Sequence, residues 1–218
     1  MIAIVDYGVG NLRSAAKGLE RAAADAGCAV DVRVTGERAA IESARAVVLP
    51  GVGAFGACMA SLEASGLVDV VRAAADSGRP FLGICVGMQI LFEESDEFGP
   101  VAGLGVLGGR VVRFRPGAVK IPHMGWNALR IRRPGGPLDG LEDGAWVYFV
   151  HSYFARPADP AVVAATCEYG GEDFTAAVAR DNLFATQFHP EKSQSTGLRL
   201  LRNFVRAAES PSRVAVPA

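Results

Sequence analysis

The sequence predicts a single α/β domain with a doubly wound, mainly parallel central sheet, flanked by helices and extended by antiparallel strands in its C-terminal half. In the first half of the 218 residues, short apolar runs alternate with Ala- and Leu-rich stretches of helical spacing. In the second half, β-rich pieces are separated by Gly, Pro and Asp turns. We expect residues 1–209 to form the domain and the Pro-containing tail, 210–218, to be flexible.

The first half is expected to contain buried strands that alternate with helices. The strands are short apolar runs, expected at residues 2–7, 29–34, 46–50 and 80–84. The helices are expected at residues 11–27, 37–44 and 57–78. Gly27 should end the first helix. Alternation at this rhythm favours a parallel sheet with helices on both faces.

The second half is expected to be mostly β-structure, antiparallel or mixed. Its strand-like pieces lie at residues 105–114, 126–132, 145–155, 161–169, 174–181 and 182–188. A last amphipathic stretch, 196–209, predicts a closing helix that covers these strands.

The composition excludes several classes of function. The 22 Lys and Arg residues oppose 23 Asp and Glu residues, so the charge balance indicates neither a nucleic-acid nor an anionic membrane partner. No apolar run approaches the ~20 residues that span a bilayer, and the N-terminus lacks the basic region of a signal peptide. The cysteines (Cys28, Cys58, Cys85 and Cys167) form no CxxC pair. We therefore expect a cytoplasmic protein without disulfides, metal site or cofactor.

The segment PFLGICVGMQILF, residues 80–92, places Cys85 where a buried strand gives way to a helical pattern. Gly83 and Gly87 flank Cys85 in a G-x-nucleophile-x-G arrangement, in which glycine permits a tight turn. The positive end and free N–H groups of the following helix favour a thiolate. Cys85 is therefore a candidate nucleophile; the alternative is a small buried core residue.

A nucleophilic thiol needs a base, and His189 is the candidate among the three histidines of the chain. It follows an expected strand in FATQFHPEKS, where Pro190 prevents a simple continuation of that strand. Glu191 is placed to orient the imidazole, which gives a Cys-His-Glu triad defined by role. The alternative is that His189 is a polar residue at a strand end and Glu191 a solvated turn residue.

The segment VVLPGVGAFG is a candidate for binding an oxyanion. A buried strand runs into Pro50, after which Gly51 and Gly53 flank Val52. Such a loop can bring backbone N–H groups to a tetrahedral intermediate if it packs beside Cys85. The alternative is an ordinary Gly/Pro turn after a parallel strand.

Together, PGVGAFG, GICVGMQ and HPEKS, in this order on a doubly wound sheet, resemble the class I glutamine amidotransferases. Three further stretches are more specific: DYGVGNLRS near the N-terminus, KIPHMGWN at residues 120–127 and YFVHSYF at residues 148–154. These are similar to the glutaminase subunits of imidazole glycerol phosphate synthases, which act in histidine biosynthesis. The resemblance covers nearly the whole chain apart from the tail.

The resemblance implies that L-glutamine is hydrolysed to glutamate and ammonia through a γ-glutamyl thioester on Cys85. His189, oriented by Glu191, would accept the thiol proton and later activate water. Gly53 matches the oxyanion-strand position, and the backbone N–H of Val86 matches the second donor. The α-amino and α-carboxylate groups of glutamine would be held by Gln89, Ser152 and Tyr153.

A partner chain is expected as well. Ammonia released into water near neutral pH becomes ammonium and diffuses away, and the glutaminase fold leaves no residues for an acceptor-substrate domain. The resemblance implies that this partner is a (β/α)8-barrel cyclase, in a heterodimer that makes imidazole glycerol phosphate and AICAR. The positions that match its interface are Asn11, Trp126, Tyr148 and Lys192. For Trp126 the alternative is a core residue, although Trp is enriched at interfaces.

Three other interpretations belong to different classes. A glutaminase partnered with pyridoxal phosphate synthase shares the triad but does not account for PHMGWN. A Cys-His peptidase or thiol stress protein would keep the turn around Cys85 without the glutamine-specific segments. A non-catalytic binding module would leave Cys85, His189 and Glu191 coincidental.

Overall fold

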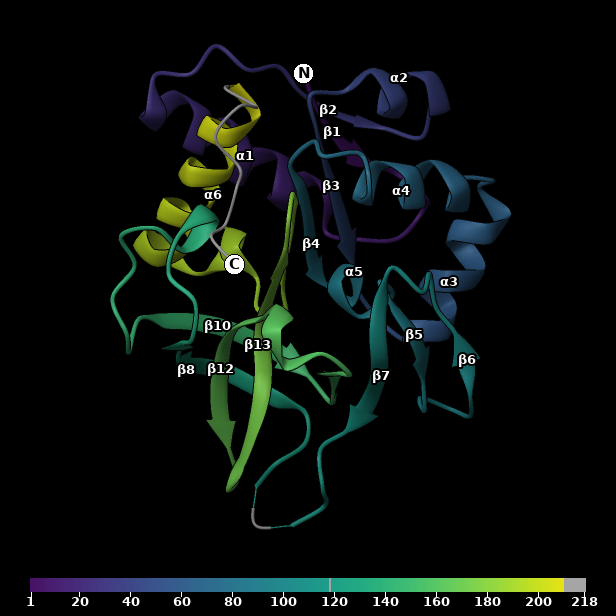
Figure 1. The fold of residues 1–218 in the computed structure, drawn as a ribbon, viewed down its shortest axis with the longest axis vertical. Coiled ribbons are helices and arrows are strands. Elements are labelled where there is room, and N and C mark those ends of the chain that lie inside the picture. The colour runs from purple at the N-terminus through teal and green to yellow at the C-terminus, as the bar shows by residue number, and fades with distance from the viewer. Residues whose placement is uncertain (118, 210–218) are drawn as a thin grey trace.

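The computed structural model describes residues 1–117 and 119–209 and shows a mixed α/β fold built on an eight-stranded sheet (Figure 1). The strand order is β2-β1-β3-β4-β14-β13-β12-β9. The first five strands in this order pair in parallel, and they are β2 (Val32–Thr35), β1 (Ile2–Val5), β3 (Ala46–Gly51), β4 (Phe81–Cys85) and β14 (Leu183–Thr186). The antiparallel extension consists of β13 (Glu172–Arg180), β12 (Val163–Tyr169) and β9 (Arg130–Ile131). The expected fold class is confirmed.

Four of the parallel strands, β1, β3, β4 and β14, are almost entirely apolar because helices cover both faces of the sheet, whereas the edge strand β2 is partly exposed. All residues of β1, β3, β4 and β14 are buried. In Figure 1, α1 (Leu12–Ala26) and α6 (Gln194–Glu209) lie on one side of these strands, and the opposite side carries α2 (Arg38–Ser43), α3 (Phe55–Ala64) and α4 (Val68–Ala75). Gly27 ends α1 in the left-handed conformation, with φ of 67°, as the sequence predicts.

Two helical predictions differ from the structure. The stretch 57–78 forms α3 and α4 instead of one helix, because Gly66 turns the chain between them with φ of 68°. The closing helix α6 covers only part of the C-terminal strands, through contacts with β10 and a cavity wall shared with β14. It packs chiefly against α1 and the short 3-10 helices η1 (Gly136–Leu138) and η3 (Pro190–Lys192), so it belongs to the cover of the parallel strands.

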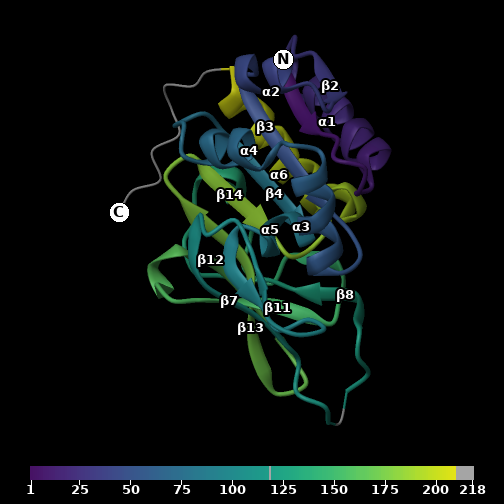
Figure 2. The ribbon, with the colours of Figure 1, turned by 90° about the vertical axis from the view of Figure 1, so that its right-hand side faces the viewer.

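The remaining strands form two small sheets. One has the order β11-β7-β5-β6, with bounds β11 (Tyr153–Pro157), β7 (Leu107–Arg113), β5 (Phe92–Ser95) and β6 (Val101–Ala102). The other pairs β8 (His123–Ala128) with β10 (Trp146–His151). The 3-10 helix η2 (Pro160–Val162) precedes β12. In Figure 2, β7, β8, β11 and the ends of β12 and β13 lie toward the end of the molecule opposite the N-terminus.

Strand register positions the candidate site. Strand β4 lies between β3 and β14 and is parallel to both, with Ile84 opposite Pro50 on one side and Thr186 on the other. Residues that follow these three strands therefore meet at one edge of the sheet, where ligands bind in open α/β folds. In Figures 1 and 2 the short helix α5 (Val86–Gln89) lies there, between the parallel strands and the small sheets.

Among residues 1–117 and 119–209, the structure has no helix long and apolar enough to cross a membrane. The tail 210–218, predicted to be flexible, lies outside the described residues.

Candidate active site

Cys85 ends β4 at a sharp turn in the backbone. Its φ of 57° and ψ of −114° lie in a region that non-glycine residues rarely adopt. Helix α5 begins at the next residue but has only one turn, so the helix dipole expected behind the sulfur is small. The free N–H groups of that turn remain available. The strain thus sits on Cys85 itself, which is held at the edge of the sheet.

The two flanking glycines serve close packing rather than the turn itself. A Cβ on Gly83 would lie 2.9 Å from the Cβ of Ala185 in β14. A Cβ on Gly87 would lie 1.9 Å from the carbonyl oxygen of Leu49 in β3. The absence of a side chain at both positions therefore lets the turn lie directly against the two neighbouring strands.

His189 and Glu191 lie at the same edge of the sheet, after β14. The Nδ1 atom of His189 is 2.8 Å from Oε1 of Glu191, and each side chain is 2% exposed. Because a carboxylate only accepts, Nδ1 carries the proton in neutral His189, and the lone pair is on Nε2. The backbone N–H of His189 donates to the Tyr148 carbonyl, and the Ser193 hydroxyl donates to the His189 carbonyl. These two bonds hold the main chain of His189, and the bond to Glu191 holds its imidazole ring.

The electrostatics of His189 are unusual for a buried imidazole. Burial lowers its pKa, but hydrogen bonding and charge interaction with Cys85 and Glu191 outweigh burial and raise the pKa to about 9. Within the described part of the chain, Nε2 of His189 and Oε2 of Glu191 make no hydrogen bond of standard geometry. A buried, unpartnered ring nitrogen beside a thiol is poised to exchange a proton with it.

A cavity of about 350 Å³ opens at this edge of the sheet. Its walls are Val52, Gly53, Cys85, Val86, Gln89, Glu97, Pro122, Val150, His151, Ser152, Tyr153 and His189. Both predicted oxyanion residues and all three predicted glutamine-binding residues line it. Glu191 does not line the cavity, because it lies behind His189 as the predicted orienting group. The volume suits a small polar metabolite.

The hydrogen bonds of Gln89 limit what it can offer to a ligand. Its Nε2 donates to the carbonyl of Tyr153 at 2.9 Å and to Oε1 of Gln187 at 3.0 Å. Both of its N–H groups are therefore committed inside the protein, which leaves Oε1 as an acceptor. In the described residues no group of three or more His, Cys, Asp or Glu side chains is placed to hold a metal ion.

The family model "Glutamine amidotransferase class-I" matches residues 4–208 of this chain. The chain belongs to this family. Two curated relatives are both named imidazole glycerol phosphate synthase subunit HisH. The one from Syntrophotalea carbinolica is 54% identical over 211 residues, covering 94% of this chain and 98% of its own. The one from Rhodopirellula baltica is 52% identical over 208 residues, covering 95% and 98%.

Solved structures share the fold of this class I glutamine amidotransferase at low sequence identity. A crystal structure of a glutamine amidotransferase superposes with a TM-score of 0.71 and 22% identity, covering 95% of this chain and 98% of the other. The glutaminase domain of Trypanosoma brucei CTPS, with bound acivicin, gives a TM-score of 0.67 at 18% identity, covering 99% and 96%. These two likenesses support the fold alone.

Two polar residues of the candidate site, Glu97 and Gln187, were not predicted from the sequence. Glu97 lines the cavity, and its Oε2 accepts the backbone N–H of Phe55 at the start of α3, at 2.7 Å. It lies in the acidic run EESDE, which has the pattern of a solvated turn. Gln187 lies directly before FHPEKS and is fully buried, with Nε2 3.9 Å from Sγ of Cys85. The strand expected at residues 182–188 does not by itself indicate that the Gln187 side chain faces Cys85.

Three of the four predicted interface residues, Trp126, Tyr148 and Lys192, meet on β8, β10 and η3. Trp126 and Tyr148 are cross-strand neighbours with ring centroids 6.1 Å apart, and Nζ of Lys192 lies 5.9 Å from the centroid of the Tyr148 ring. Trp126 is 41% exposed, so it is not a core residue of this chain. Asn11 lies elsewhere, at the N-cap of α1, which packs against η3.

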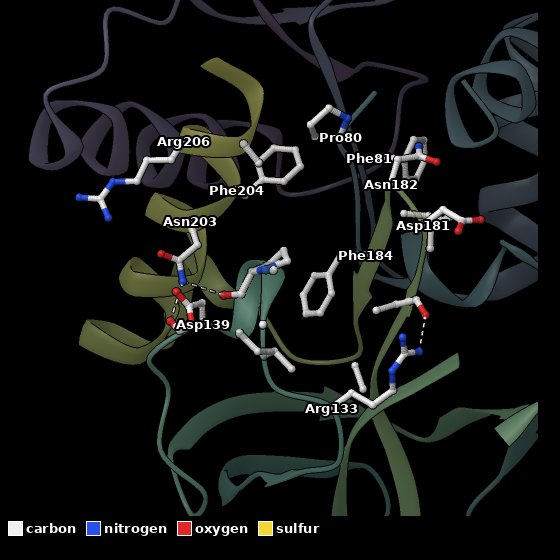
Figure 3. Close-up of a pocket in the computed structure, with 18 residues that line it drawn as sticks. Pro80, Phe81, Arg133, Asp139, Asp181, Asn182, Phe184, Asn203, Phe204 and Arg206 are labelled. Atoms are coloured by element: carbon white, nitrogen blue, oxygen red, sulfur yellow. Dashed lines mark hydrogen bonds between the residues drawn. The ribbon is translucent and has the colours of Figure 1, made fainter. Parts of the chain in front are cut away.

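A second cavity, of about 270 Å³, lies at the opposite edge of the sheet (Figure 3). It is lined by Phe81 and Leu183, the first residues of β4 and β14, and by the last turns of α6. Cys85 and His189 follow the other ends of these two strands. This cavity is therefore separate from the amidotransferase site.

Proposed function

We propose that this chain is the glutaminase subunit of an imidazole glycerol phosphate synthase, which hydrolyses L-glutamine and supplies ammonia to a cyclase partner in histidine biosynthesis. Two HisH relatives more than half identical over nearly their whole length support this assignment. The observation that supports the chemistry is the meeting of Cys85 with the His189–Glu191 pair at the wall of one cavity.

The first half of the reaction forms a thioester. His189 accepts the thiol proton at Nε2, and the sulfur of Cys85 attacks the γ-carboxamide carbon of glutamine. The backbone N–H groups of Gly53 and Val86 stabilise the oxyanion, since both residues line the cavity beside Cys85. The protonated His189 then donates to the leaving nitrogen, so that ammonia departs and the γ-glutamyl thioester remains.

The second half returns the enzyme to its starting state. His189 removes a proton from water, and the hydroxyl oxygen attacks the thioester carbon. The C–S bond breaks, glutamate leaves and Cys85 recovers its proton. The hydrogen bond to Glu191 keeps the imidazole in the tautomer that both halves need.

Cavity chemistry supports an amino acid as the substrate. The carboxylate of Glu97 and the free Oε1 of Gln89 are acceptors that suit the α-ammonium group of glutamine. Ser152 and Tyr153 also line the cavity, and we propose that they hold its α-carboxylate. A peptidase site would need an open cleft for chain on both sides of the cysteine, whereas Cys85 is 4% exposed.

The partner is proposed to dock on the exposed side of β8 and β10. Met124, Trp126 and Trp146 are 63%, 41% and 57% exposed there, although large apolar side chains are usually buried. Lys192 and Tyr148 lie beside them. We propose a (β/α)8-barrel cyclase as this partner, and a cytoplasmic location in keeping with four free cysteines.

Cys85→Ala and Cys85→Ser test the assignment. Both should abolish glutamine-dependent turnover by the complex with the cyclase, while turnover supplied with ammonium salts survives, because only ammonia release needs the thioester. Glutamate release and product formation are measured separately in the same samples. Loss of both activities would instead assign Cys85 to the fold or the interface.

A further inference from the structure

A buried carboxamide faces the candidate nucleophile. Gln187 directly follows β14, is 0% exposed, and holds its Nε2 3.9 Å from Sγ of Cys85. Its backbone N–H donates to the carbonyl of Ala176 in β13, so the main chain at this point is part of the sheet. The question is whether the nitrogen or the oxygen of the carboxamide faces the sulfur, since the two ends have opposite effects on a thiolate.

The neighbouring hydrogen bonds decide this orientation. A backbone carbonyl only accepts, so the end of Gln89 that lies 2.9 Å from the Tyr153 oxygen is its NH₂ group. The same NH₂ group lies 3.0 Å from the carboxamide of Gln187 and must meet its oxygen. The NH₂ group of Gln187 is then left for Cys85. Turning the amide over would set two donors against each other and an oxygen against the sulfur.

The carbonyl of Tyr153 also determines the tautomers of two buried histidines, His151 and His123. His151 has its Nδ1 2.9 Å from the Tyr153 oxygen, so Nδ1 carries the proton and Nε2 is an acceptor. The Nδ1 of His123, 3.1 Å from that Nε2, must therefore donate. The Nε2 of His123 in turn accepts from Nδ2 of Asn127 at 3.4 Å. Burial lowers the pKa of His123 to about 4 and that of His151 to about 3, which keeps both rings neutral.

We propose that Gln187 is a catalytic residue whose amide N–H stabilises the thiolate of Cys85, and that the buried chain from His123 through His151, the Tyr153 carbonyl and Gln89 holds it in that orientation. A hydrogen bond donated to the charged form of an acid favours that form. Each group in the chain has one tautomer or rotamer that satisfies all its neighbours, so the donor is oriented before the substrate binds. The proposal rests on Cys85 as the nucleophile.

The test measures the reactivity of the Cys85 thiol directly, without glutamine. The full chain is alkylated with iodoacetamide at a series of pH values, and mass spectrometry follows the peptide that contains Cys85. Gln187→Met keeps the length of the side chain and removes the donor. We expect the midpoint of alkylation to move to higher pH, and the rate at neutral pH to fall about tenfold, which is near the low end for a hydrogen bond to a charged group. Glutaminase kcat should fall by a similar factor, with KM little changed.

Gln187→Glu is the second variant, because it keeps an acceptor toward Gln89 and replaces the donor by a carboxylate. It should raise the alkylation midpoint at least as far as Gln187→Met does. Thermal melting of each variant reports whether it folds, so a loss of reactivity in a folded protein is assigned to the missing donor.

His123→Phe tests the positioning chain. Phenylalanine preserves the stacking of ring 123 between Phe149 and Tyr169, whose centroids lie 4.8 and 4.0 Å away, and removes the hydrogen bond to His151. We expect a smaller shift of the alkylation midpoint in the same direction. If His123 acts through Gln187, the double variant with Gln187→Met should be no more impaired than Gln187→Met alone.

The outcomes separate this proposal from the proposed function. If folded Gln187→Met and Gln187→Glu alkylate with the wild-type pH profile, the role of Gln187 is wrong even though Cys85 is the nucleophile. Strictly additive effects in the double variant would overturn the positioning chain. Full glutaminase activity in Cys85→Ala would instead overturn the proposed function.

Discussion

At the scale of single residues, the candidate site combines a proposed nucleophile of strained backbone, Cys85, with an imidazole whose two nitrogens have different surroundings. The positive φ of Cys85 is maintained because β3 and β14 hold the turn from both sides. One nitrogen of His189 is occupied by Glu191, and the other makes no hydrogen bond of standard geometry among the described residues, although it interacts with Cys85. Proton transfer is thereby directed to a single ring atom.

His189→Asn should remove this proton transfer. General acid–base catalysis by one side chain typically contributes ~10²–10⁴-fold, and we expect glutamine hydrolysis to fall by at least this factor. Turnover supplied with ammonium salts should be preserved in the complex. His123→Asn is the control, because His123 is also a buried histidine but does not line the cavity. Equal damage from both changes in isolated glutamine hydrolysis would show that the base is assigned wrongly.

The free energy of unfolding should depend on pH in opposite directions through two kinds of histidine: His123 and His151, whose pKa values are lowered, and His189, whose pKa is raised. His123 and His151 have lowered pKa values, about 4 and about 3, so the unfolded chain takes up their protons first as pH falls below about 6.5. Their burial therefore costs stability progressively between about pH 6.5 and 4, by roughly 1.4 kcal/mol per pH unit for each ring. His189, with its pKa raised to about 9, stabilises the fold below about pH 6.5 and loses this contribution as pH rises toward 9.

Urea unfolding across pH 4 to 9 measures both effects. His123→Phe should flatten the acid side, and Glu191→Gln should flatten the alkaline side, because the Glu191 carboxylate contributes to the raised pKa of His189. Unchanged slopes in both variants would contradict the assignment.

At the scale of elements, some features were readable from sequence and others were not. The strand before Cys85 and the left-handed end of α1 follow from an apolar run and from Gly27, which are local signals. By contrast, the apolar stretch 145–155 divides into β10 and β11, which join different sheets on either side of Ser152. Alternation along a chain does not reveal which neighbour a strand will pair with, because pairing depends on residues far away in sequence.

The Gly51–Val52–Gly53 segment at the end of β3 gives a prediction at this scale, because a side chain would meet different surroundings at Gly51 and at Gly53. Gly53 has φ of 87° and open space where a Cβ would be, so Gly53→Ala introduces backbone strain without a clash. That strain is about 1–2 kcal/mol, and we expect glutaminase turnover by the complex to fall about tenfold while subunit binding is preserved. Wild-type turnover in Gly53→Ala would exclude a role for this backbone geometry.

Gly51 is the contrasting position. A Cβ there would lie 2.5 Å from the backbone nitrogen of Gly87, so Gly51→Ala must push β3 away from the turn that holds Cys85. Gly51→Ala should therefore lower the melting temperature as well as the activity, whereas Gly53→Ala should change activity more than stability. Gly51→Pro would combine a clash with restricted φ and cannot separate the two effects.

At the scale of the whole molecule, the site is assembled from both halves of the chain. The proposed nucleophile and the proposed oxyanion loop come from the first half, and His189, Ser152 and Tyr153 come from the second. That Cys85 and His189 would be candidates for one site could be predicted from short motifs, because each motif carries its own chemistry, and both residues line the same cavity. Glu97 and Gln187 could not be predicted in this way, since only the packing of β14 against β4 and of α3 against the loop after β5 brings them to the cavity.

The Gly51–Val52–Gly53 segment lies at the wall of the cavity, where a change in its backbone would alter the proposed oxyanion donors. In this structure the thiol of Cys58, in α3, donates to the carbonyl of Val52 at 3.3 Å. Because a trans peptide is planar, the N–H of Gly53 points to the opposite side of that unit. A peptide flip in this loop would exchange an N–H for a carbonyl at the oxyanion position, and removal of one such donor typically costs ~2.7–4 kcal/mol of barrier.

We therefore expect glutaminase activity of the complex to rise by about 10²–10³-fold when the ligand of the cyclase is added. An uncontrolled glutaminase would consume glutamine without using the ammonia, whereas a loop that changes one donor can keep turnover low until the acceptor is bound. Glutamate release by the complex is measured with and without the cyclase ligand, at saturating glutamine. Isolated subunit with the same ligand is the control and should show no rise. Equal rates for the complex in both conditions would rule out ligand-gated activation, and the loop would then serve only to bind the oxyanion.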